Sequence, residues 1–348
     1  MLNLLFLIFT WVVTPDLDRG IFQGIYLIYQ DDFNYATMIF DSLIKKFDGN
    51  PLPYVLKAGA LDTYMLDHST REKENEFFKT VKKGIKVSRS ALKNAQNSED
   101  SAWIYFSLAS LHGYSAIRKG RNKSYLSALK DAYNAISFYK KTISLNPRLY
   151  DAYLGLGSFH FALSELPRFV KWFIAPGDYR RKALEEIKLA ADSGKYTRIV
   201  AKDTYAWVLA YWKPTKDAIK YAEEVVDSFP NSRSFWWTLG FTYRRRGYWW
   251  KVENVFKRLI PMTLKDQREY YLSVALVYFN LARAKYFTGK IDDSKWYLDL
   301  AYLNLYFVSE DQPELAETRK SFERLKNLIR KRKQWRKVHA KRITKNPR

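Results

Sequence analysis

Residues 153–160 (YLGLGSFH) and residues 236–243 (WWTLGFTY) share one spacing: an aromatic residue, Leu-Gly at the fourth and fifth positions, and a ring-bearing residue at the eighth. Each stretch begins six residues after a proline, Pro147 or Pro230. The pattern therefore recurs at an offset of 83 residues, together with the proline that precedes it. This recurrence predicts one structural unit that occurs at least twice in the chain.

An alanine extends the match, because Ala135 and Ala218 each lie twelve residues before one of the prolines. The combined pattern is that of a tetratricopeptide repeat, whose first helix carries W-x-x-L-G-x-x-Y and whose second helix has a small residue at the close approach. We therefore predict an all-α fold, a tetratricopeptide-like helical-repeat solenoid of roughly fourteen helices over residues 18–323. In such arrays each helix pair packs on its neighbours, and the usual role is to hold another molecule.

The composition agrees with this fold class. The 348 residues are 47% hydrophobic and 17% aromatic, which is ample for a core, and the 14 glycines and 11 prolines are few, as expected for long helices with short turns. We find no alternating apolar pattern between turn residues that would indicate a strand. Typical predicted helices are Trp249 to Leu259 and Arg268 to Phe287.

One segment interrupts the array. Residues 163–179 (LSELPRFVKWFIAPGDY) insert about a dozen residues where a tight turn is expected. The insertion carries three large aromatic side chains, Phe169, Trp172 and Phe173. It is either a flap that shapes a binding pocket or a loop that covers an exposed edge of the stack.

The N-terminus carries a targeting signal. Residues 2–13 are apolar except for Asn3 and Thr10, a run that is short for a membrane span and typical of the core of a signal peptide. No Lys or Arg precedes the run, and no A-x-A site follows it. We predict that residues 1–17 are a signal peptide or an uncleaved anchor, which would place the protein in the periplasm or cell envelope. The alternative is a first helix of the array in a cytoplasmic protein.

Catalytic and metal-binding patterns are missing from the sequence. The absence of cysteine excludes disulfides, a thiolate nucleophile and Cys-ligated metals. The four histidines have no ligand spacing, and no nucleophile elbow, phosphate-binding loop or dinucleotide fingerprint occurs. We predict a protein that is not an enzyme and has no cofactor and no metal. His160, which takes the tyrosine position of its repeat, is expected to be a packed or hydrogen-bonded residue at a helix interface.

Charge is concentrated at the C-terminus. Residues 324–348 hold twelve Lys or Arg and no acidic residue, about half of the formal net charge of +23. Apolar residues keep helical spacing as far as Val338, so we expect a basic amphipathic helix that runs into a disordered end. This tail could bind anionic lipid, which we favour slightly, or nucleic acid, or it could simply cap the array. The residues expected to face an anionic surface are Arg330, Lys331, Arg332, Lys333, Trp335, Arg336 and Lys337.

A family resemblance rests on three motifs between about Ser101 and Leu259: residues 151–164 (DAYLGLGSFHFALS), 176–178 (PGD) and 190–196 (AADSGKY). With these, the chain resembles a bacterial family of exported tetratricopeptide-repeat (TPR) proteins of undefined activity. It is more distantly similar to the eukaryotic TPR family linked to inclusion-body clearance and lipid droplets. The resemblance implies a scaffold or interaction role.

The leading functional interpretation is a scaffold that binds a protein or peptide in the concave face of the solenoid. Trp, Tyr and Arg carry much of the energy of such interfaces. The candidate residues are Trp207, Trp212, Trp237, Tyr243 and Arg244, although any aromatic residue at helical spacing is more often part of a core. The alternatives are a nucleic-acid-associated repeat protein and a small-molecule or lipid carrier closed by the 163–179 flap.

Overall fold

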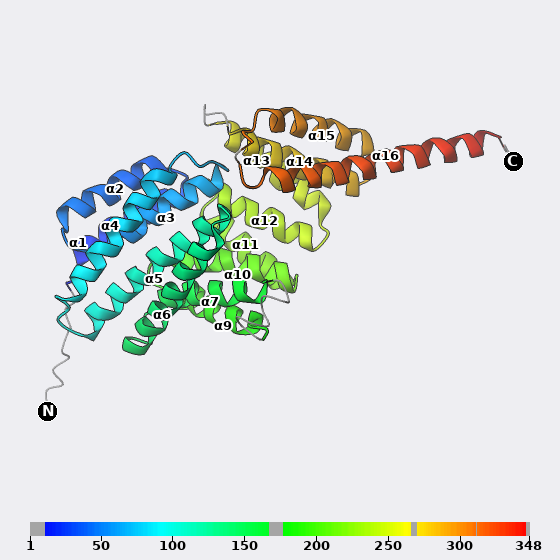
Figure 1. Cartoon of the computed structure of the whole chain (residues 1–348). Helices are drawn as coiled ribbons and strands as arrows, with labels where there is room; N and C mark the ends of the chain where they lie inside the picture. Colours follow the sequence, from blue (N-terminus) through cyan, green and yellow to red (C-terminus); the bar gives the residue numbers. More distant parts are fainter. Residues whose placement is uncertain (1–10, 167–176, 266–269, 311, 346–348) are drawn as a thin grey trace. The chain divides into compact units, whose positions relative to one another are not determined.

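The computed structural model describes residues 11–166, 177–265, 270–310 and 312–345, with side chains as far as residue 336 (Figure 1). Within these ranges the chain forms fifteen α-helices and no strand. The predicted all-α class is therefore confirmed. The chain divides into two compact units: unit 1 is Met1–Leu66 with Arg71–Phe235, and unit 2 is Asp67–Thr70 with Trp236–Arg348.

Unit 1 is built from helix pairs. α1 packs with α2, α5 with α6, α7 with α9 and α10 with α11, while α4, α6 and α9 each contact the first helix of the next pair. This packing on sequence neighbours is the pattern of a repeat array. The helices are α1 (Pro15–Tyr29), α2 (Phe33–Lys46), α3 (Leu52–Asp67), α4 (Glu74–Leu92), α5 (Ser98–Arg121), α6 (Tyr125–Leu145), α7 (Asp151–Ser164), α9 (Arg180–Ser193), α10 (Arg198–Trp212) and α11 (Lys216–Ser228).

Unit 2 continues the same architecture. Its helices are α12 (Arg233–Arg245), which begins in unit 1, α13 (Trp249–Leu264), α14 (Tyr271–Phe287), α15 (Ile291–Tyr306) and α16 (Leu315–Lys345). Phe322, Leu325 and Ile329 of α16 are buried in a core with residues of α14 and α15. α13 passes through Pro261, so its predicted end at Leu259 is wrong, although the proline removes one backbone donor from its last turns.

Small residues bring the paired helices together. A Cβ added at Gly24 of α1 would lie 2.5 Å from the Phe40 ring of α2. One at Gly157 of α7 would lie 2.8 Å from the Ala183 carbonyl oxygen of α9. Gly240 of α12 has the same relation to Phe256 of α13, at 2.8 Å. The glycine of the recurring motif is thus the contact point between the two helices of a pair.

The alanines of the pattern occupy the expected close-packed positions. Ala135 in α6 is fully buried and Ala218 in α11 is 1% exposed.

Asp151, at the start of α7, links this helix to the segment before α10. Its carboxylate accepts the backbone N–H groups of Lys195, Tyr196 and Thr197 at 2.9, 2.7 and 2.8 Å. These donors lie just before α10, where a negative charge is favourable.

In unit 1 the first helix contacts segments near the other end of the unit. Asp18 forms an ion pair with Lys195, 2.6 Å apart, and Asp31 accepts the backbone N–H of Arg233 at 3.0 Å. Between these two contacts, the buried Tyr29 ring packs edge-on against Phe229, with centroids 4.9 Å apart. The repeat array of unit 1 therefore curves enough for α1 to reach residues 195–235.

Residues 11–17 belong to the packed structure. The Val12 carbonyl accepts a hydrogen bond from Asn50 Nδ2 at 2.9 Å, and the Thr14 side chain caps α1. Val12 and Leu17 are fully buried. The array thus begins before the predicted boundary at residue 18, and the signal peptide or anchor stays a prediction. Among the described helices, none has the length and apolarity needed to cross a bilayer.

Two other predicted segments are the C-terminal end and the 163–179 flap. The expected disordered end after Val338 is wrong as far as Lys345, because α16 continues to that residue. Lys and Arg are good helix formers, and no proline occurs in α16, so loss of the apolar pattern does not end the helix. The flap residues Phe169, Trp172 and Phe173 lie outside the described residues.

Candidate functional site

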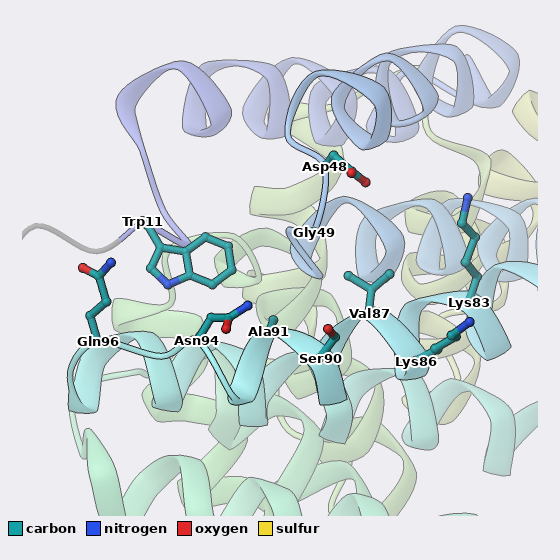
Figure 2. A pocket seen from close by; sticks show the side chains of 10 residues that line it. All are labelled: Trp11, Asp48, Gly49, Lys83, Lys86, Val87, Ser90, Ala91, Asn94 and Gln96. Carbon is teal, nitrogen blue, oxygen red and sulfur yellow. The ribbon is translucent and has the colours of Figure 1, made fainter.

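Two hollows in unit 1 flank α4. The first has a cavity volume of about 760 Å³ and is lined by Trp11, Asp48, Gly49, Lys83, Lys86, Val87, Ser90, Ala91, Asn94 and Gln96 (Figure 2). The second has a volume of about 520 Å³ and is lined by Phe78, Val81, Lys82, Ile85, Lys86, Arg89, Ser115, Lys119 and Asp131. Since Lys86 lines both, we name the two hollows together the α4 groove.

The first hollow lies between α4 and two segments of irregular backbone. Figure 2 shows Trp11 above one end of it, beside Asn94 and Gln96, and Lys83 and Lys86 at the other end. Val87 and Ala91 supply an apolar floor. The hollow therefore combines apolar surface with side chains that donate hydrogen bonds at both ends.

One carboxylate holds the Trp11 end of this hollow. Asp100 accepts the backbone N–H of Trp11 at 3.2 Å and that of Gln96 at 3.1 Å. The indole Nε1 of Trp11 is buried and has no hydrogen-bond acceptor among the residues that the structure describes. Such a donor costs free energy unless water or a ligand satisfies it.

The second hollow has an apolar wall from α4 and a polar wall from α5 and α6. Asp131 accepts hydrogen bonds from His112 at 2.9 Å, Ser115 at 2.7 Å and Lys119 at 2.6 Å. Burial raises the pKa of Asp131, but these three hydrogen bonds outweigh burial and the net pKa is lowered. Asp131 is therefore a charged, fully engaged group at neutral pH.

A row of five cations runs along α4 beside the hollows. The row comprises Lys79, Lys82, Lys86, Arg89 and Lys93, which alternate in steps of three and four residues and are all exposed. None of the five has an ion-pair partner in the described part of the chain. We name this set the cationic row. The sequence contains its 3-4 spacing, but our sequence analysis missed it because the row is part of an otherwise ordinary amphipathic helix.

Some other cations of unit 1 are paired with carboxylates. Lys57 lies 2.8 Å from Asp41 and 2.9 Å from Glu76, and the buried Arg118 pairs with Asp62. These pairs join neighbouring helices and have an evident structural role. The cationic row is different, because its charges face solvent without a carboxylate partner.

The predicted partner-binding residues of α10 differ in exposure. Trp207 is 37% exposed and stacks on Tyr211, with centroids 5.4 Å apart. Trp212 is half-buried, and the Lys213 ammonium lies 4.8 Å from its ring centroid. Trp207 and Tyr211 therefore form a small exposed aromatic surface in unit 1.

The remaining three candidates belong to α12 in unit 2. Trp237 packs edge-on against Phe256 at 5.0 Å, and Tyr243 is only 7% exposed, so both contribute to packing. The Arg244 guanidinium lies 5.2 Å from the Phe241 centroid. Burial, followed by the neighbouring Arg283 and Arg245, lowers the pKa of Arg244 to about 10, which still leaves it charged at neutral pH.

Several tail residues help to hold α16 in unit 2. Arg332 and Arg336 donate hydrogen bonds to the carbonyl oxygens of Tyr286 and Gly289 at 3.4 and 2.9 Å, and Lys333 pairs with Asp292 at 2.6 Å. Arg330, Lys331 and Trp335 are exposed. The side chain of Lys337 lies outside the described ones.

His160 has the structural role expected from the sequence. Its ring is buried, its Nδ1 lies 2.5 Å from Glu186 Oε2, and it stacks on Tyr179 with centroids 5.7 Å apart. No group of three His, Asp or Glu within the described ranges could hold a metal ion.

Comparison with known proteins finds solved structures with a similar fold. No family model and no curated protein matches the chain. The crystal structure of the APC/C hetero-tetramer Cut9-Hcn1 is 13% identical with a TM-score of 0.53, over 87% of this chain and 54% of that one. The chain thus spans about half the length of the chain that it matches.

Two further solved structures have lower scores. A tetratricopeptide repeat protein from Parabacteroides merdae is 12% identical with a TM-score of 0.42, over 89% of this chain and 100% of that one. Yeast Tom70 is 12% identical with a TM-score of 0.39, over 96% and 86%. The predicted TPR-like solenoid fold is confirmed, with a match to Cut9-Hcn1 above a TM-score of 0.5.

Proposed function

We propose that this protein is a non-enzymatic scaffold that binds a segment of another protein, and that the α4 groove is its binding surface. The solenoid fold is suited to this role, and one similar solved structure, with a TM-score of 0.53, comes from a complex of two different proteins, Cut9 and Hcn1. The observation that carries the proposal is the pair of adjoining hollows, which combine apolar floors with unengaged donors on packed helices.

We favour the α4 groove over the concave face for the principal partner. Tyr29 on α1 and Tyr139, which faces α5, are buried in unit 1, Tyr114 on α5 is half-buried, and desolvation raises the pKa of each hydroxyl. Large side chains therefore already fill much of the space between these helices. The exposed stack of Trp207 on Tyr211 is the best candidate for a secondary contact on the α10 side.

Ser90→Trp tests the α4 groove, because the indole would fill the first hollow. The matched control is Ser137→Trp on α6, which is also exposed but lines neither hollow. We expect peptides selected from a random library on the unaltered protein to bind Ser90→Trp at least about tenfold more weakly, a loss of about 1.4 kcal/mol. If the peptides bind Ser90→Trp as tightly as the unaltered protein, the α4 groove is not the binding surface. The comparison requires that both variants keep the helicity and Tm of the unaltered protein.

A second proposed function is binding of an anionic surface by the basic face of α16. It is supported by the exposure of Arg330, Lys331 and Trp335, which is 59% exposed, beyond the buried Ile329. Deletion of residues 330–348 should remove most salt-sensitive binding to phosphatidylserine vesicles. Trp335→Ala should weaken vesicle binding more than RNA binding, because an indole is favoured at the headgroup interface. Equal binding by the full and shortened chains would refute this proposal.

We further propose that the apolar residues before Trp11 act as an export signal or anchor, which would place the protein at the cell envelope. The support is the apolar run itself, together with the hydrogen bonds that hold Trp11 and Val12 within unit 1. On this proposal any removed segment ends before residue 11.

A further inference from the structure

We propose that the α4 groove recognises an acidic segment of the partner protein, with carboxylates against the cationic row and apolar side chains in the two hollows. This inference rests on the proposed scaffold function and adds the chemical class of the partner. It uses a surface of unit 1 where volume, hydrogen-bond donors and unpaired charge occur together.

The cationic row presents a continuous line of positive charge. Its members recur at three- and four-residue steps, so their side chains point to one face of α4. Lys79 and Lys93 are fourteen residues apart, which corresponds to about 21 Å along a helix axis. Like charges at these steps repel one another and weaken the helix. The row therefore does not stabilise the free protein, and an acidic partner would relieve the repulsion.

The first hollow adds directional donors to this charge. The buried Trp11 Nε1–H has no acceptor among the described residues, and an indole nitrogen can only donate. Lys83 and Lys86 at the opposite end also only donate. Asp48 is the single carboxylate that lines this hollow. A ligand rich in acceptors, such as carboxylate and carbonyl oxygens, would satisfy the two lysines directly, and a rotation of the Trp11 side chain would bring its N–H to the same ligand (Figure 2).

The shape of the groove favours a polypeptide over a phosphate backbone or a bilayer. Phe78, Val81 and Ile85 line the second hollow, and Val87 and Ala91 line the first. Volumes of about 760 and 520 Å³ accommodate large apolar side chains. A segment that alternates acidic and apolar residues fits both features. It would need about fourteen residues as a helix or about six to seven as a strand to span the row.

The test measures fluorescence anisotropy of a fluorescein-labelled fourteen-residue peptide with Glu at 3-4 spacing and Leu between, against the full chain. A second peptide has Gln in place of every Glu. The α4 variant is Lys82→Gln with Lys86→Gln and Arg89→Gln. The control removes three exposed and unpaired charges from α6 in the same unit, Lys130→Gln with Lys140→Gln and Lys141→Gln.

We expect the α4 variant to bind the Glu peptide at least about tenfold more weakly and the α6 variant less than about threefold more weakly, since only close charge pairs couple strongly. The Gln peptide should also bind at least about tenfold more weakly. Trp11→Phe, which keeps an aromatic side chain but removes the N–H and part of the indole surface, should weaken binding of the Glu peptide severalfold. Circular dichroism and Tm must match the unaltered chain.

Equal losses in the α4 and α6 variants, or equal binding of the two peptides, would overturn the inference. The inference would also be overturned if the α4 variant bound the Glu peptide as tightly as the unaltered chain but bound a fourteen-nucleotide RNA or phosphatidylserine vesicles more weakly. The selected library peptides could instead be uncharged, bind Ser90→Trp more weakly, and bind the α4 charge variant as tightly as the unaltered chain. In that case the scaffold function stands and the acidic partner is wrong. If no peptide is sensitive to Ser90→Trp, the use of the α4 groove fails first.

Discussion

Gly157 has almost no room for a side chain, because a Cβ there would lie 2.8 Å from both the Ala183 carbonyl oxygen and Ile187 Cγ1. The backbone oxygen cannot move aside without shifting α9. We therefore expect Gly157→Ala to lower the free energy of unfolding by about 1–3 kcal/mol, measured by urea denaturation. The control is Gly120→Ala, since nothing lies within 4 Å of a Cβ at that helical position.

Gly120→Ala should be neutral or stabilise by up to about 1 kcal/mol, because alanine restricts the unfolded chain. If the two substitutions have the same effect, the close approach of α7 and α9 at Gly157 is wrong. Gly240→Ala should cost less than Gly157→Ala, because its nearest neighbours are the Phe256 ring and a Val255 methyl, which are side chains that can shift.

Asp131 makes stability depend on pH. Its folded-state pKa is lowered, so its contribution is present above the unfolded pKa of about 3.9 and is lost as pH falls through the folded value. Asp131→Asn should cost about 1–3 kcal/mol at pH 7, since one acceptor oxygen and the negative charge are lost and an NH2 donor faces either His112 or Ser115 and Lys119. The difference between the variant and the unaltered chain should shrink below about pH 4.

The matched control for this measurement is Asp192→Asn. Asp192 pairs with Lys188 at the surface, 2.6 Å apart with both side chains nearly half exposed, so its loss should cost under about 1 kcal/mol. An Asp131→Asn variant as stable as this control would contradict the hydrogen-bond network at Asp131.

At the scale of the element, residues 11–17 decide where the chain can be shortened. A chain that begins at Asp18 loses the Thr14 cap and the buried Val12 and Leu17, which together contribute about 4 kcal/mol or more. A chain that begins at Trp11 keeps all three. We expect thermal melting to separate these two chains by many degrees. Intact mass from the native host should show an N-terminus at or before Trp11, and a mature chain that begins at Asp18 would contradict this boundary.

The helices themselves could largely be predicted from sequence, for a physical reason. Apolar periodicity and the Leu-Gly and alanine positions are local properties, and Gly157, Gly240, Ala135 and Ala218 all lie where the repeat pattern predicts. The errors are at helix ends, where the pattern is weakest: α13 continues through Pro261 and α16 continues to Lys345.

The site could be predicted only in part. Trp207 is exposed as a contact residue should be, but Tyr243, which is also aromatic, is buried. The α4 groove was missed because a hollow depends on which helices pack beside it. The backbone of Trp11, which lines the first hollow with α4, is held by Asp100 of α5, 89 residues away in sequence.

At the scale of the whole molecule, the contacts between α1 and residues 195–235 had no signal in the sequence. A repeat pattern specifies how each pair stacks on the next, and small rotations at every step accumulate into a curvature that no single repeat encodes. The pairing of Asp31 with Arg233, 202 residues apart, is a result of that accumulation within unit 1. The prediction that a partner binds in the concave face stays a prediction.

The same contacts can form only late in synthesis of the chain. α1 leaves the ribosome early, but its partners Lys195, Asn231 and Arg233 are made about 180 to 200 residues later. At 5–20 residues per second this delay is on the order of 10 to 40 s. Throughout that interval Phe22, Tyr26 and Tyr29 lack the rings of Tyr196 and Phe229 that they later contact. The N-terminal helix is thus available to chaperones and targeting factors until unit 1 has been synthesised.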